Sequence, residues 1–237
     1  MEGFSYTNIF ETKGIEYIAV IIFFLILIPF WIILNKKGKL SSKINQILNV
    51  LSFDAIKIPQ GIFYGKNHTW AFMEKTGKAS VGIDDFLVQT TGNVKLNKLK
   101  NPGDIINRGD LMTELVLDNK SLNIYSPISG KIESLNDQLN ENPELLNEDP
   151  FGKGWIYKIK PVKWMDEVKS CYLAEDAVNW SRTEMVRFKD FLAASNQKYS
   201  PNQAFTVLQD GGELSTHTLS LLPDNIWKDY QKSFLDI

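Results

Sequence analysis

The stretches YSPISG (125–130) and NPELLNEDPFGKGWIYKIKP (142–161) decide the fold of this chain. Each joins turn-forming Pro and Gly residues to extended apolar segments, and the second also carries a run of helix formers after Pro143. We predict one or two helical turns there, followed by a strand over WIYKIK (155–160) whose side chains alternate between two faces. Two further extended segments flank the polar turn DNK (118–120), just before the first stretch.

The same pattern of short strands and turns extends back to Gly61. Asn-Pro-Gly-Asp (101–104) and Arg-Gly-Asp (108–110) mark turns, and DDFLVQTTG (84–92) has the pattern of a short helix closed by Gly92. Many short strands with regular turn signals favour a compact, mainly β barrel or sandwich over a parallel α/β sheet.

These motifs carry a family resemblance. The His-x-Trp of residues 68–70, VGIDDFLVQTTGNV (81–94), PGDIINRGD (102–110) and the two stretches quoted first occur along one domain. Residues 62–161 therefore resemble the H protein of the glycine cleavage system. The resemblance implies a lipoyl-domain-like barrel-sandwich hybrid, in which two small sheets pack together and a hairpin tip displays a lipoyl-lysine.

The resemblance also implies that the modified lysine stands six residues before the start of the Tyr-Ser-Pro turn. Counting back from Tyr125 gives Asn119, and Lys120 is one residue late. A one-residue offset sends a strand side chain to the opposite face, although a turn can absorb it. Two interpretations stay open: Lys120 carries a covalent lipoate, or it is a solvated turn lysine in a domain that has lost its arm and binds no cofactor.

The N-terminal region differs in character from the rest of the chain. Residues 17–34 contain no charged side chain. As a helix rising ~1.5 Å per residue, this segment is about long enough to cross a hydrocarbon core of ~30 Å. Because no basic start or cleavage site accompanies it, we predict a transmembrane helix over 15–35 rather than a cleaved signal. A short extracytoplasmic lead (1–14) would precede it and a juxtamembrane linker or helix (36–60) would follow.

Four lysines just after the predicted helix orient the chain. The positive-inside rule places them in the cytoplasm, so we predict a single-pass protein of the inner membrane with N-out, C-in topology. They would contact anionic headgroups of the lipid bilayer. These residues are Lys36, Lys37, Lys39 and Lys43.

The region 162–237 lies outside the resemblance and has two helical patterns. SRTE (181–184) fits a capping box before one of them, and the second begins near Asp224. Two helices are too few for a large independent core, so we expect them to pack on the barrel or on a partner. Their expected apolar positions are Met185, Val186, Phe188, Phe191 and Leu192, then Ile226, Trp227, Tyr230 and Phe234.

The remaining polar candidates favour structural roles. His68 has no nearby cysteine or second histidine, so we predict a packed structural histidine and no metal site. We expect His217 at the surface, an inert buried thiol at Cys171, and turn or cap roles for the acidic pairs 84–85 and 148–149. A net charge of −2 without a basic stripe beyond the juxtamembrane lysines argues against nucleic-acid binding.

Two functions from different classes follow, and neither is enzymatic. The first is a membrane-anchored docking or scaffold subunit of a membrane-associated metabolic or redox complex, with protein partners bound through the barrel and the C-terminal helices. The alternative is a lipoyl carrier modified at Lys120, which shuttles an aminomethyl, acyl or sulfur-bearing group, or electrons. No catalytic residue is predicted in either case.

Overall fold

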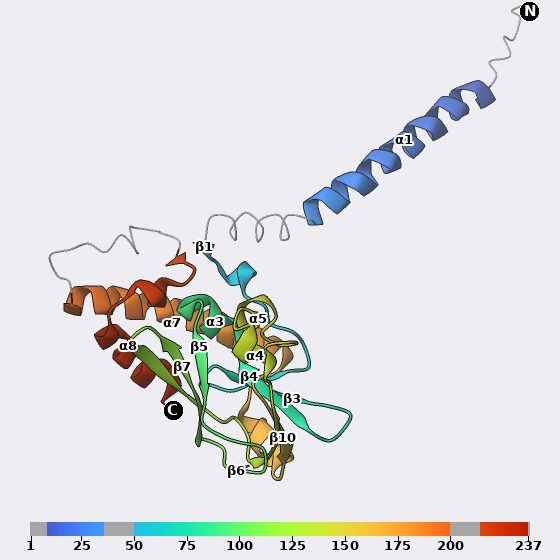
Figure 1. The fold of residues 1–237 in the computed structure, drawn as a ribbon. Coiled ribbons are helices and arrows are strands. Elements are labelled where there is room, and N and C mark those ends of the chain that lie inside the picture. Colours follow the sequence, from blue (N-terminus) through green and yellow to red (C-terminus); the bar gives the residue numbers. More distant parts are fainter. Residues whose placement is uncertain (1–8, 36–49, 200–213, 237) are drawn as a thin grey trace, which may run out of the picture. The chain divides into compact units, whose positions relative to one another are not determined.

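The computed structural model describes residues 9–35, 50–199 and 214–236 (Figure 1). The chain divides into two units, residues 1–44 and 45–237. The first contains the helix α1 (Ile9–Asn35), whose described side chains, residues 17–31, are exposed. Within the described ranges, no helix combines the length and the apolar character needed to cross a membrane. The predicted transmembrane helix over 15–35 therefore gains no support from the structure.

The second unit is built on two antiparallel sheets, as the mainly β prediction requires. The larger has the strand order β2-β3-β4-β10-β9-β6 and the smaller the order β5-β7-β8, which leaves β8 at an edge. The larger sheet consists of β2 (Phe63–Tyr64), β3 (Thr69–Met73), β4 (Ala79–Ile83), β10 (Tyr157–Pro161), β9 (Gly130–Leu135) and β6 (Ile105–Ile106). The smaller consists of β5 (Lys95–Lys98), β7 (Leu111–Leu117) and β8 (Lys120–Tyr125).

The strand β10 shows how the alternating sequence produces the core. Tyr157 and Ile159 are fully buried, whereas Lys158 and Lys160 face the other way. The Tyr157 hydroxyl donates a hydrogen bond of 2.9 Å to the carbonyl of Met112 in β7. Because β10 and β7 belong to different sheets, this bond joins the two layers.

Short helices fill the connections where the sequence predicts them. α3 (Asp85–Thr91) is capped by Asp84, whose carboxylate accepts from the Leu87 backbone N–H at 2.9 Å, and it ends at Gly92 with a φ of +78°. α4 (Gln138–Glu141) and α5 (Leu145–Glu148) precede β10. The cap and turn roles expected for the acidic pairs hold for Asp84 and also for Asp149, which accepts from the backbone of Gly152.

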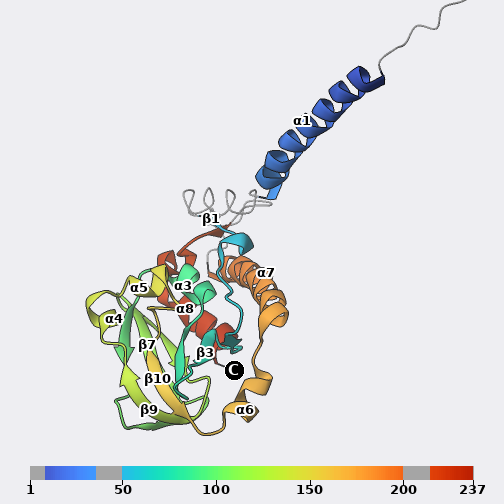
Figure 2. The same cartoon turned by 90° about the vertical axis from the view of Figure 1, so that its right-hand side faces the viewer.

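The C-terminal elements lie against the sheets (Figure 2). The long helix α7 starts at Ala174, so the capping box expected at Ser181 is wrong. Ala177 and Ser181 are themselves buried in the helix face, and their small side chains hide that part of the periodic pattern. The elements in order are α6 (Trp164–Glu167), η2 (Val168–Ser170), α7 (Ala174–Tyr199), η3 (Thr218–Leu221), α8 (Asp224–Tyr230) and the π-helical turn η4 (Gln231–Leu235).

A two-stranded antiparallel pairing joins the N-terminal part of this unit to its C-terminal part. β1 (Val50–Leu51) pairs with β11 (Leu214–Ser215), and a 3-10 turn, η1 (Phe53–Ala55), follows β1. Of the predicted juxtamembrane linker or helix (36–60), residues 36–49 lie outside the described residues, and from residue 50 the chain forms this short strand and turn rather than an α-helix.

Barrel and C-terminal helices share one hydrophobic core. The buried side chains of α7, α8 and η4 form a single cluster with those of β4, β7 and β8. In it the rings of Tyr230 and Phe234 stack at 4.6 Å, and Phe188 meets both edge-on. The expectation that the helices pack on the barrel is confirmed, except that Val186 is 56% exposed.

Candidate functional site at the β7–β8 hairpin

The hairpin between β7 and β8 turns through only two residues. Leu117 pairs with Lys120 across the ladder, so Asp118 and Asn119 form the exposed tip. Asp118 has a left-handed φ of +52°, a conformation that aspartate and asparagine tolerate better than most residues. Lys120 is therefore the first residue of β8 and not part of the tip.

The ammonium group of Lys120 contacts the C-terminal segment. Its Nζ donates to the carbonyl of Ser220 at 2.6 Å and to that of Leu222 at 3.1 Å. It also lies 5.1 Å from the ring centroid of Trp227, a cation–π distance. The interpretation of Lys120 as a solvated turn lysine is wrong in this respect, since a distant segment holds its charged end.

The same segment covers the outer edge of β8. The Asn123 backbone N–H donates to Oε1 of Gln231 at 2.7 Å, and Nε2 of Gln231 donates back to the Asn123 carbonyl at 3.2 Å. The side-chain amide thus takes the place of a neighbouring strand, which protects an edge from unwanted pairing. Two residues further on, the Tyr125 hydroxyl donates to Asp236 at 3.1 Å.

A buried charged cluster joins the barrel to α7. His68 is fully buried with a left-handed φ of +57°, its Nδ1 lies 2.8 Å from Asp84 and its Nε2 3.6 Å from Glu184. Burial alone would lower the pKa of His68, but the two carboxylates outweigh that effect and raise it to about 9. Its ring stacks on Phe86 at 4.9 Å between centroids.

The cluster continues to the C-terminal end of the chain. Burial acts to raise the pKa of Glu184, but His68 and Arg187 together hold it below the usual range. The Arg187 guanidinium donates to Glu184 at 2.8 Å and to the carbonyl of Ser233. Sequence reasoning missed both residues, although their i,i+3 spacing with opposite charges is a helix-pair signal. The cluster connects β-strand loops, α7 and η4.

Comparison with known proteins identifies the domain that carries this hairpin. The family described as Glycine cleavage H-protein matches residues 62–184, more than half of the chain. This chain belongs to the glycine cleavage H-protein family. The match runs past Pro161, where the sequence resemblance ended, and takes in α6 and the start of α7 up to Glu184.

Two relatives found by sequence agree with this assignment, and one solved structure is also similar. A probable glycine cleavage system H protein of Pyrococcus horikoshii is 33% identical over 127 residues, which cover 54% of this chain and 94% of that protein. The glycine cleavage system H protein of Cronobacter sakazakii is 36% identical over 103 residues, or 44% of this chain and 80% of that protein. A crystal structure of a Mycobacterium marinum H protein gives a TM-score of 0.41 at 25% identity, covering 44% of this chain and 87% of that one.

The hairpin of this H-protein domain does not fit a lipoyl group in the arrangement described. Attachment needs an accessible amine, but the exposed tip offers Asp118 and Asn119, neither of which carries one. The amine of Lys120 already donates to two carbonyls, and amide formation would also remove the charge that Trp227 and these carbonyls stabilise. The residues present therefore disagree with the cofactor that the resemblance implies.

The other candidate residues have structural surroundings. His68 is a packed, hydrogen-bonded histidine as predicted, and the described ranges contain no cluster of His, Cys, Asp and Glu able to hold a metal. Cys171 is half-buried rather than buried as expected, and this burial raises the pKa of its thiol. His217 is half-buried rather than at the surface, with its backbone N–H donating to Gln89 at 2.7 Å.

Proposed function

We propose that this member of the H-protein family works without a lipoyl arm, as a non-enzymatic docking subunit. Its barrel and C-terminal helices would bind protein partners in a metabolic or redox complex. The observation that carries the proposal is the capture of the Lys120 ammonium by the carbonyls of Ser220 and Leu222.

The captured amine is poorly suited to modification. A ligase would have to withdraw Lys120 from two charge-assisted hydrogen bonds, which contribute at most roughly 1.5–3 kcal/mol each. Further along the same strand, Gln231 and Asp236 bond Asn123 and Tyr125, so the C-terminal elements contact β8 at several points. A swinging arm additionally needs free space around its attachment point, whereas Lys120 is half-buried.

A docking role has separate support from exposed apolar side chains on the larger sheet and just after its strand β10. Ile105 and Val162 are both 75% exposed and Met165 is 71% exposed. The strand register places Ile105 opposite Lys131 and Lys131 opposite Lys160, two residues before Val162. A contiguous apolar patch marks a protein-contact site, and these three side chains are the candidates for such a patch here.

Intact-mass measurement tests the absence of the arm. Full-length protein purified from its own cells, grown with lipoate, should have the unmodified mass. The matched positive control is Asn119→Lys, which moves an amine to the exposed tip without a left-handed φ. A lipoate ligase should modify this variant in vitro and leave the native protein unchanged.

The lipoyl carrier stays the alternative, because membership of the H-protein family favours it. An added lipoyl mass on the native protein that disappears in Lys120→Ala would establish the carrier and overturn the docking proposal. Unmodified native protein together with lipoylated Asn119→Lys would leave the docking proposal standing and show that the rest of the domain is still recognisable to the ligase.

Membrane attachment is a second part of the proposal and rests on the sequence. Residues 17–34 are uncharged, basic residues follow them, and the apolar side chains described from Tyr17 to Trp31 are exposed. Such a helix needs an apolar environment, which lipid provides. A compartment reporter fused after residue 237 should be active in the cytoplasm, whereas periplasmic activity would overturn the N-out, C-in orientation.

A further inference from the structure

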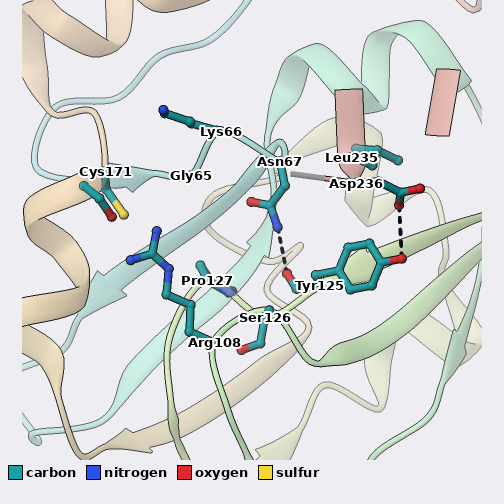
Figure 3. A pocket seen from close by; sticks show the side chains of 12 residues that line it. Gly65, Lys66, Asn67, Arg108, Tyr125, Ser126, Pro127, Cys171, Leu235 and Asp236 are labelled. Atoms are coloured by element: carbon teal, nitrogen blue, oxygen red, sulfur yellow. Dashed lines mark hydrogen bonds between the residues drawn. The ribbon is translucent and has the colours of Figure 1, made fainter. Parts of the chain in front are cut away.

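A pocket of about 540 Å³ opens where the barrel meets the C-terminal elements (Figure 3). The barrel contributes the loop 65–67 and the turns at 108–109 and 125–127, and the C-terminal elements contribute 170–171 and 235–236. This volume is within the range of small-molecule sites, roughly 300–1,000 Å³. The hairpin lysine is not part of its lining.

Two cationic side chains, Lys66 and Arg108, line the pocket, and neither forms an ion pair with a carboxylate of the described residues. The carboxylate of Glu167, whose backbone carbonyl accepts from Arg108, is bonded to the backbone N–H and hydroxyl of Ser129, at 2.7 and 2.5 Å. The lining also contains the carboxylate of Asp236, which forms an ion pair with neither cation.

The position of Arg108 is set by groups other than a charge partner. Its backbone N–H donates to the Ser129 hydroxyl at 2.8 Å, and its Nη1 donates to the carbonyl of Glu167 at 3.0 Å. A guanidinium has five N–H donors in a planar fork that suits carboxylates and phosphates. Anchoring one of the five leaves the others to bind a ligand.

The charged and apolar residues of the lining differ in their exposure. Pro127 and Leu235 are buried at the floor, whereas Lys66 and Arg108 are exposed. Figure 3 shows Arg108 beside Cys171 on one side of the pocket and Asp236, bonded to Tyr125, on the other. Asp236 also accepts from Gln231 at 2.5 Å, and these two neutral donors hold its carboxylate on the side away from Arg108. With two cations and one carboxylate, the lining keeps an excess of one positive charge.

We propose that this pocket binds a small organic anion, a carboxylate or a phosphate monoester with an apolar body. The anionic group contacts Arg108 and Lys66, and the apolar body packs on Pro127 and Leu235. The site is independent of the hairpin, so its existence does not depend on whether Lys120 carries an arm.

Titration calorimetry on the full-length protein tests the site with three ligands of one shape. Phenylacetate and phenyl phosphate supply the two anionic groups, and neutral phenylacetamide is the matched control. We expect saturable binding of at least one anion, weakened tenfold or more in the double variant Lys66→Gln/Arg108→Gln. The charge control Lys75→Gln, at an exposed turn outside the pocket, should bind as the native protein does.

Cys171 supplies a second readout, because it lines the pocket and is the only cysteine in the sequence. Iodoacetate and iodoacetamide have similar size and differ in charge. Removing each positive charge should lower the iodoacetate-to-iodoacetamide rate ratio by about threefold, the factor for a unit charge at roughly 6 Å in water. A bound anion should protect the thiol. Equal binding of phenylacetamide, unchanged anion binding in the double variant, or no saturable binding would overturn the proposal.

Discussion

The buried His68 makes the stability of the folded domain depend on pH. Its pKa in the folded protein is about 9, against an ordinary value of 6.5. The folded state therefore keeps a proton that the unfolded chain releases. The stabilisation is complete below about pH 6.5 and is lost as the pH rises through 9.

The size of the effect follows from that difference. Between 6.5 and about 9, each unit corresponds to about 1.4 kcal/mol, which gives a loss of about 3 kcal/mol in the free energy of unfolding. The groups that face the imidazole are the carboxylates of Asp84 and Glu184, with Arg187 beyond the second. Removing the proton leaves these carboxylates with less compensating charge.

Urea unfolding monitored by tryptophan fluorescence at several pH values from 6 to 10 measures the loss. The matched variant is His68→Asn, because asparagine tolerates the left-handed φ of +57° and can donate to Asp84 but does not titrate. Its overall stability will be lower, so the slope against pH is the quantity to compare. Equal slopes for the native protein and His68→Asn would refute this account of the cluster.

Three further substitutions test other contacts. Glu184→Gln should lower the His68 pKa in an NMR titration and reduce the free energy of unfolding by about 3 kcal/mol, because it removes one partner of a buried pair. The control Glu175→Gln, on the exposed side of α7, should change neither quantity. Gln231→Ala should raise amide hydrogen exchange at Asn123 about tenfold, since the loss of its partner at the β8 edge corresponds to about 1–1.5 kcal/mol; unchanged exchange would mean that Gln231 does not protect the edge. Tyr157→Phe should lower the free energy of unfolding by about 1–2 kcal/mol in urea titrations through loss of the bond between the sheets, and an unaffected midpoint would show that this bond adds nothing.

Much of the barrel follows from local chemistry in the sequence. The alternation in β10, the Asp84 cap and the left-handed Gly92 at the end of α3, and the helical turns before β10 were all predictable. Each depends on residues within a few positions of one another, because side-chain alternation, capping and backbone φ preferences are short-range effects. The ordered motifs also sufficed to identify the family to which residues 62–184 belong.

The start of α7 was beyond this kind of reasoning. Its first turns bury Ala177 and Ser181, small residues that carry no strong helical periodicity, so the apolar pattern seemed to begin only at Met185. These positions are buried because the surface of the barrel packs against them. That surface is formed by residues far away in the chain.

Some features of the hairpin likewise follow from the sequence, and one depends on the tertiary structure. By itself the sequence determined that Asn119 stands six residues before Tyr125, where the resemblance predicts a lysine, and that Lys120 follows directly. Only the tertiary structure decided what Lys120 does, because its partner carbonyl at Ser220 lies 100 residues away. A backbone carbonyl has no residue-specific signature in the sequence, so a contact of this kind becomes visible only once the chain has folded.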